Sequence, residues 1–224
     1  QSSDTYGFGI YKNFNDDKIE VGLEGYYRET KNVLTYKPGA DFFLEEFLER
    51  DVVQGKGNAY GVELSFKKPR GKVNGWFNYT WSRSLMRTTS MNLLDRINNN
   101  KQYASDFDRP HVFNGTINFE GDKYNTWSLN FTGQSGRPYT IANGVVPRVG
   151  LDVPIFLERN NSRLPTYHRL DFSWKVRYSK KANRRWVGDW TFTVYNVYAR
   201  KNPFNTYYSQ RNGRIGDVNS AIFL

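Results

Sequence analysis

The 224-residue chain contains no cysteine and only two histidines, His111 and His168. The lack of cysteine excludes a disulfide framework and a thiolate metal site, and two distant histidines argue against a histidine metal site. No run of about 18 apolar residues is present, which excludes a membrane-spanning helix. Phosphate-binding loops, nucleophile elbows and histidine-rich metal signatures are also missing. We therefore expect neither an enzyme nor a protein that holds a cofactor.

A signal peptide and an initiator methionine are missing as well, since the chain begins at Gln1. This favours a processed chain or part of a longer one. The net charge of +10 is compatible with nucleic-acid binding. However, the basic residues are spread over strand positions and turns instead of one helix or groove. We therefore expect no nucleic acid among the partners.

Polar and apolar residues alternate strictly over residues 166–178. Leu170, Phe172 and Trp174 share one face of this segment, whereas Arg169, Asp171 and Lys175 share the other. A period of two predicts a strand, and its two faces must meet an apolar medium and water respectively. This is the pattern of a strand in an outer-membrane β-barrel.

Seven further segments carry weaker versions of the same alternation. The eight predicted strands lie near residues 5–13, 19–28, 60–67, 73–82, 113–119, 127–131, 166–178 and 190–194. Tyrosine and phenylalanine, 16 of each, dominate their apolar faces and recur near strand ends, as the aromatic girdles of a barrel require. A soluble β-sandwich would draw mainly on Val, Ile and Leu. The predicted fold class is thus all-β, an antiparallel transmembrane β-barrel.

Short turns and long gaps alternate along the chain. The long gaps cover residues 30–58, 84–110 and 136–165, and a short amphipathic helix is expected over residues 41–50. Outer-membrane barrels keep short turns in the periplasm and long loops outside, so the first strand should run toward the periplasm. We expect the outer membrane of a Gram-negative bacterium, with lipid and lipopolysaccharide as neighbours. The basic turn at residues 180–185 is a candidate contact for inner-leaflet phosphates.

Six motifs in order resemble the later barrel strands of TonB-dependent receptors of the Bacteroidetes type. They cover residues 55–63, 79–82, 106–111, 135–140, 161–171 and 195–204. The resemblance implies a barrel of about 22 strands whose lumen is closed by a plug. It also implies uptake driven by the TonB complex, and a substrate such as a glycan fragment, a peptide or a metal chelate.

The chain departs from this family pattern in length. Residues 1–224 are expected to form a partial barrel domain of about eight strands, without the plug, the N-terminal barrel strands or the closing strand. Two other hypotheses stay open: a structural or scaffolding subunit of a larger outer-membrane complex, with a surface lipoprotein among its partners, and a free-standing eight-stranded barrel. In a free-standing barrel the first and eighth strands must be hydrogen-bonded to each other.

Charged residues near the strand ends are the candidate ligand contacts, in the lumen or the loops. They are Asp108, Arg109, His111, Arg163, Arg169 and Asp171. A structural interpretation competes with this one. Asp108 and Arg109, with Asp106, would form ion pairs that fix a loop, and Arg163, Arg169 and Asp171 would pair along the inner wall. His168 shares the lipid-facing register, which favours a place in the aromatic belt over metal ligation.

Overall fold

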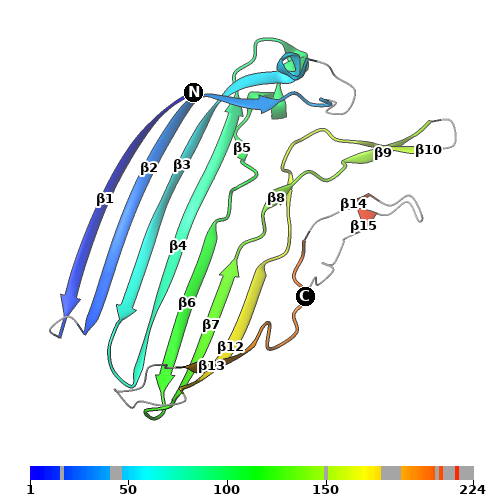
Figure 1. Ribbon diagram of the computed structural model, residues 1–224. Helices are drawn as coiled ribbons and strands as arrows, with labels where there is room; N and C mark the ends of the chain where they lie inside the picture. The colour runs from blue at the N-terminus through cyan, green and yellow to red at the C-terminus, as the bar shows by residue number, and fades with distance from the viewer. Residues whose placement is uncertain are drawn as a thin grey trace.

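The computed structural model describes residues 1–15, 18–40, 47–148, 151–177, 188–204, 207–208 and 215–216. Its body is one curved antiparallel sheet (Figure 1). The strands are β1 (Ser2–Phe14), β2 (Ile19–Tyr36), β3 (Val52–Lys68), β4 (Val73–Thr88), β6 (His111–Glu120), β7 (Asn125–Gln134), β12 (Tyr167–Arg177) and β13 (Asp189–Val194), paired in this order, with β5 (Tyr103–Ala104) added to the free edge of β4. The predicted fold class is confirmed.

The sheet is open between its first and last strands. β1 pairs with β2 alone and β13 with β12 alone among the described residues. A free-standing barrel of eight strands requires these two edges to meet, so that hypothesis is contradicted. The sheet instead has the form of a segment of a barrel wall (Figure 1).

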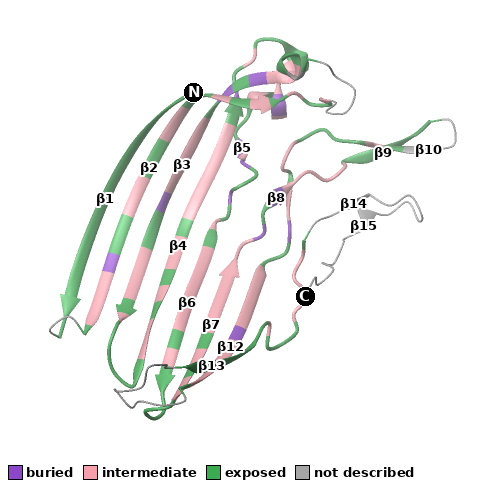
Figure 2. Cartoon of the chain, in the orientation of Figure 1, coloured by how far each residue is buried: buried purple, intermediate pink, exposed green. Residues whose placement is uncertain are grey.

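One face of the sheet carries the predicted apolar residues in continuous rows. The register aligns Phe66, Phe77, Gly115, Phe131 and Leu170 across five strands. These residues are not buried between two layers. Phe8 is 73% exposed and Ile117 58%, and Figure 2 shows exposed and intermediate positions over nearly the whole sheet. An apolar face open to its surroundings is the arrangement that lipid contact requires.

Aromatic side chains stack across neighbouring strands on this face. Ring centroids of Phe66 and Phe77 lie 5.1 Å apart, and those of Phe119 and Trp127 lie 5.6 Å apart. Offset aromatic pairs at such distances stabilise a sheet beyond their buried area, by about 0.5–1.5 kcal/mol each. They compensate in part for the absence of a second layer.

Three strands are longer than the sequence predicts. β2 continues to Tyr36, β3 begins at Val52 and β4 continues to Thr88, so residues 30–36, 52–58 and 84–88 were wrongly assigned to gaps. Pairing continues there across a register shift between Lys31 and Val33. The alternation ends because apolar residues come there in adjacent pairs, one on each face: Val33-Leu34, Val52-Val53 and Leu85-Met86. Strands of 16–18 residues exceed the about 10 that cross a membrane.

Long connections gather at one end of the sheet and short turns at the other, as predicted (Figure 1). The long connections contain η1 (Leu48–Asp51), η2 (Leu93–Asp95), η3 (Ile97–Asn100), β8 (Pro138–Tyr139), β9 (Gly144–Arg148), β10 (Leu151–Ile155) and β11 (Ser162–Arg163); the short pair β14 (Tyr207–Tyr208) and β15 (Ile215–Gly216) follows β13. Residues 41–46 of the expected helix and the basic turn 180–185 lie outside the described residues; 48–51 form a 3-10 helix.

A small hydrophobic core lies at the loop end of the sheet. Val53, Ile97 and Tyr103 are buried together, and Met86 packs against them. Thr88 accepts a hydrogen bond from the backbone N–H of Ile97 at 3.1 Å. The connection between β4 and β6 is therefore folded down onto the inner face of β3 and β4. In the part of the chain described, no helix is long and apolar enough to cross a membrane.

Candidate functional site

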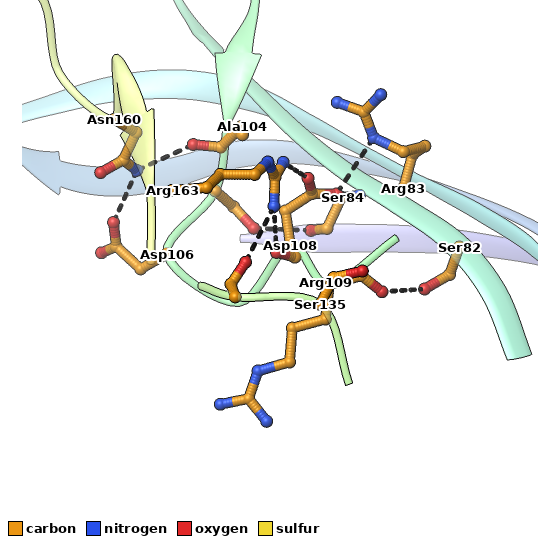
Figure 3. Close-up of polar contacts among 12 residues, drawn as sticks. Ser82, Arg83, Ser84, Ala104, Asp106, Asp108, Arg109, Ser135, Asn160 and Arg163 are labelled. Atoms are coloured by element: carbon orange, nitrogen blue, oxygen red, sulfur yellow. Dashed lines mark hydrogen bonds and ion pairs between the residues drawn. The ribbon is translucent and has the colours of Figure 1, made fainter. Parts of the chain in front are cut away.

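Asp108 is the centre of the polar contacts at the loop end. Its side chain is fully buried, and its carboxylate accepts hydrogen bonds from the backbone N–H of Ser84 at 2.6 Å and from Arg163 Nη2. Arg83 Nε lies 3.4 Å from the same carboxylate (Figure 3). A buried carboxylate is stable when cations and N–H donors surround it in this way. Asp108 thus joins β4 to β11 through a residue of the β4–β6 connection.

Arg159 connects the loops around Asp108 to the end of β2. Asn98 and Arg159 exchange two hydrogen bonds, from Asn98 Nδ2 to the Arg159 carbonyl (2.9 Å) and from the Arg159 N–H to Asn98 Oδ1 (2.7 Å). The Arg159 guanidinium donates to Thr35 Oγ1 and to the Tyr36 carbonyl, both at 2.8 Å. The connections after β4 and after β7 are therefore fixed to the end of β2. Burial raises the pKa of the nearby Tyr103 phenol, although the Arg159 guanidinium opposes that shift.

Asn160 adds two contacts between the same connections. Its Nδ2 donates to the Ala104 carbonyl at 2.8 Å and to Asp106 Oδ1 at 2.7 Å (Figure 3). Gly136 packs against Leu164, which directly follows β11, so closely that a Cβ at Gly136 would come within 1.6 Å of the Leu164 carbonyl oxygen. We call the set Arg83, Asn98, Asp108, Arg159, Asn160 and Arg163 the loop junction.

A hollow of about 360 Å³ opens beside the loop junction. Its lining comes from all three long connections: Pro38, Gly39, Arg96, Ile97, Asn98, Thr140, Phe156, Leu157, Glu158 and Arg159. Leu157 is 71% exposed. Half of the lining residues are polar or charged, and a concavity that combines apolar surface with convergent polar groups is typical of ligand sites. The loop junction fixes the relative positions of these walls.

The structure separates the six predicted ligand residues. Asp108 and Arg163 are together in the loop junction, where their contacts are with protein. Asp108 thus forms ion pairs that fix a loop, but with Arg83 and Arg163 instead of Arg109, and Asp106 accepts a hydrogen bond from Asn160. Arg109 is exposed and donates to Gln134 Oε1 at 2.7 Å. His111 lies instead on the outer face, in the register of Trp81, with Nδ1 2.8 Å from the Tyr79 hydroxyl. Ligand binding by these residues stays a prediction.

Arg169 and Asp171 lie on the inner face, as predicted, but do not pair between neighbouring strands. They pair within β12, Arg169 Nη2 lying 2.9 Å from Asp171 Oδ2. Asp171 Oδ1 also accepts from the backbone N–H of Asn196, 2.9 Å away, just after β13. The second histidine, His168, stands on the outer face beside Phe131 and Tyr198, the place expected for it. Among the described residues no cluster of three or more His, Asp or Glu side chains could hold a metal ion.

Sequence reasoning missed four residues of the loop junction: Arg83, Asn98, Arg159 and Asn160. Two of them, Asn98 and Asn160, have positive φ (50° and 55°). Asparagine is one of the few residues that adopt this conformation readily. The asparagine-rich stretches 98–100 and 160–161 are therefore the signal that could have located these turns.

An open antiparallel sheet with an apolar outer face, a polar inner face and long loops at one end defines the wall of an outer-membrane β-barrel. Residues 1–197 match the family described as TonB dependent receptor-like, beta-barrel. The chain belongs to this family, which lies in the outer membrane of Gram-negative bacteria and serves transport, not catalysis. The family also implies interaction with TonB. No curated protein and no solved structure matches the chain.

Proposed function

We propose that this chain forms the later strands of a larger barrel, of the Bacteroidetes type, and that a nutrient crosses the outer membrane along its inner face. The plug and the segment that contacts TonB would belong to other parts of the same protein. The observation that carries the proposal is the chemistry of the inner face of β4, β6 and β7. It differs from the charged inner faces of β2 and β12.

The inner face of β4, β6 and β7 is polar and nearly free of formal charge. Asn118 Nδ2 donates to Asn74 Oδ1 at 3.1 Å, and Ser128 Oγ donates to Asn118 Oδ1 at 2.7 Å. Thr116 Oγ1 donates to Asn130 Oδ1 at 2.8 Å. Neutral amides and hydroxyls offer donors and acceptors together, which matches a neutral, hydroxyl-rich solute.

Trp76 stands on this inner face and is 40% exposed. An indole ring among neutral hydrogen-bonding groups provides an apolar platform beside polar contacts. Of the three substrate classes, a glycan fragment fits this wall best. A charged metal chelate would gain less from uncharged partners, and a peptide would require pockets for its side chains.

Capture would begin at the hollow beside the loop junction, and passage would follow along the neutral wall once the plug moves. The loop junction would hold the walls of the hollow in place, with Asp108 acting as a positioning residue because its side chain is fully buried. The β4–β6 connection holds two of the predicted ligand residues, Asp108 and Arg109, and of these two Arg109 is the one exposed to solvent.

Growth on single neutral oligosaccharides tests this proposal in cells that carry the full-length protein. The variant is Trp76→Ala, and the matched control is Trp127→Ala, which removes the same ring from the outer face. We expect Trp76→Ala to slow growth on at least one oligosaccharide, with Trp127→Ala and growth on glucose unchanged. Equal growth of both variants on every oligosaccharide, with a defect only on peptides or ferric chelates, would reject the glycan assignment.

A scaffolding role is the second candidate, and one feature of the outer face favours it. A hollow of about 560 Å³ lies near the loop end of β6 and β7, lined by His111, Phe113, Phe131, Gly133, Gln134, Ser135, Thr166, His168 and Tyr198. Chemical crosslinking in intact outer membranes, from an introduced Thr166→Cys, tests it. A protein partner crosslinked there, in cells whose growth is insensitive to Trp76→Ala, would support the scaffold over the transporter.

A further inference from the structure

The outer face of the sheet contains a second, strongly apolar hollow, near the short turn that joins β3 to β4. It measures about 440 Å³ and lies in the lipid-facing register. Its apolar walls are Phe66, Val73, Phe77, Phe113, Ile117, Leu129, Phe131 and Leu170, and its floor is Gly75 and Gly115. A smooth barrel surface would have side chains at those two glycine positions.

Close approach of the strands explains why glycine forms the floor. Gly75 has φ +155°, and a Cβ there would come within 2.1 Å of the Thr116 carbonyl oxygen. A Cβ at Gly115 would lie 3.2 Å from the Cβ of Phe77. The backbone at these two glycines thus leaves a groove between the surrounding aromatic rings.

The height of the groove matches one membrane leaflet. It extends over four paired rows, from Val73, through Gly75 and Phe77, to Phe113. Three steps of two residues correspond to about 20 Å along the strands at about 3.3 Å per residue. Strands of such barrels are tilted by about 40° and their apolar band is about 25 Å tall, so the groove rises about 15 Å and covers somewhat more than half of the band, on the side of the short turns.

Positive charge lies at the turn end of the groove. Lys68 is half-buried and lines the groove, and Arg70 and Lys72 are exposed in the same turn. Among the described residues, no salt bridge involves any of these three. The nearby Glu120 accepts a hydrogen bond from Asn74, an inner-face residue. The groove therefore joins an apolar channel to a cationic end.

The geometry points to a binding site for one anionic glycerophospholipid of the inner leaflet, with an acyl chain in the glycine-floored groove and its phosphodiester at Lys68 and Arg70. Lipid fits better than a protein segment because the groove ends at the level of a headgroup, where the cations lie. The surrounding outer face is also the one that hydrocarbon covers. This site does not depend on whether the protein transports or scaffolds.

Native mass spectrometry of the purified full-length protein, titrated with dioleoyl phosphatidylglycerol, tests the charged end. Lys68→Gln removes the half-buried cation, and Lys123→Gln removes a cation from the β6–β7 turn as the matched control. We expect Lys68→Gln to weaken binding about tenfold, the factor associated with loss of one charge-assisted hydrogen bond. Lys123→Gln should bind as the wild type does, and Lys68→Arg should retain binding.

Filling the groove tests its apolar part. Ile117→Trp places an indole ring over the glycine floor, whereas Leu23→Trp adds the same ring to the outer face of β2, away from the groove. We expect only Ile117→Trp to reduce retention of the lipid, and heat-dependent migration in detergent gels verifies that each variant is folded. Two results would overturn the site: equal affinity of Lys68→Gln and Lys123→Gln for dioleoyl phosphatidylglycerol, or equal affinity of the wild type for dioleoyl phosphatidylglycerol and dioleoyl phosphatidylcholine. Either would show that the groove contacts only the ordinary lipid around the barrel.

Discussion

Arg163 donates two hydrogen bonds to Asp108, a residue 55 positions earlier in the chain: Nη1 donates to the backbone carbonyl at 2.9 Å, and Nη2 donates to the carboxylate. The two residues come from different long connections. The contact therefore fixes one loop to another, and both to β4 through the Ser84 N–H.

Substitution of the carboxylate should loosen this end of the barrel without unfolding the sheet. Asp108→Asn leaves Arg83 and Arg163 without their counter-charge, and we expect a local loss of about 1–3 kcal/mol. Faster protease cleavage within residues 89–110 in intact cells, with unchanged heat-dependent gel migration, is the expected result. Glu49→Gln, at an exposed carboxylate of another long connection, is the control. Identical cleavage of the two variants would show that Asp108 does not fix the loop.

Arg159 should control the width of the hollow beside the loop junction. Arg159→Ala removes both hydrogen bonds to the end of β2, whereas Arg96→Ala breaks only bonds within one connection, to the Ser90 and Met91 carbonyls. Because the chain has no cysteine, spin labels at Leu34→Cys and Leu157→Cys report their distance without background.

We expect a broader distance distribution between the two spin labels for Arg159→Ala, and a wild-type distribution for Arg96→Ala. The reason is that the guanidinium is the part of Arg159 that reaches Thr35 and Tyr36. A distribution as narrow as that of the wild type in both variants would show that other contacts position the loop after β7.

The strands and their apolar faces could be predicted because one physical constraint applies at every second residue. Lipid contact selects apolar side chains on one face, as at Phe172 and Trp174, and the register places them in common rows with Leu129 and Trp127. Outside the membrane, lipid contact no longer selects apolar side chains at every second residue. The extensions of β2, β3 and β4 keep their hydrogen bonds but lose the alternation, which is why their ends were misplaced.

The loop junction could be predicted only in part. Charges at Asp108 and Arg163 indicated ion pairs, but nothing in the sequence specifies that these two residues meet across 55 positions of irregular chain. The same applies to Asn98 and Arg159, 61 positions apart. His111 was misplaced for another reason. It belongs to β6, whose alternation puts it on the outer face, whereas its charged neighbours precede the strand.

Arginine should destabilise the barrel much more on one face of β7 than on the other. Leu129 faces lipid near the middle of the sheet and Asn130 faces inward. The cost of a lipid-facing cation is about 0–1 kcal/mol near the interface and rises to about 2–4 kcal/mol at the bilayer midplane, so we expect Leu129→Arg to cost at least about 1 kcal/mol and Asn130→Arg to cost much less. Urea unfolding of the full-length protein in phospholipid vesicles, followed by tryptophan fluorescence, measures both. Equal costs would contradict the assignment of the two faces.

The turn between β6 and β7 should depend on pH through Asp122. Its Oδ1 accepts from the backbone N–H groups of Tyr124 and Asn125, each at 2.7 Å, and these bonds hold the pKa of Asp122 below its ordinary value. A depressed folded-state pKa stabilises the fold above the unfolded pKa of about 3.9, and this contribution is lost as the pH falls through the folded value. Asp122→Ala should therefore lower resistance to urea at neutral pH, and its deficit relative to the wild type should shrink in strong acid. Ser128→Ala, which removes an uncharged hydrogen bond between β7 and β6, should have an effect that does not change over this acidic range. A deficit for Asp122→Ala that stays constant with pH would show that the carboxylate's charge does not stabilise the turn.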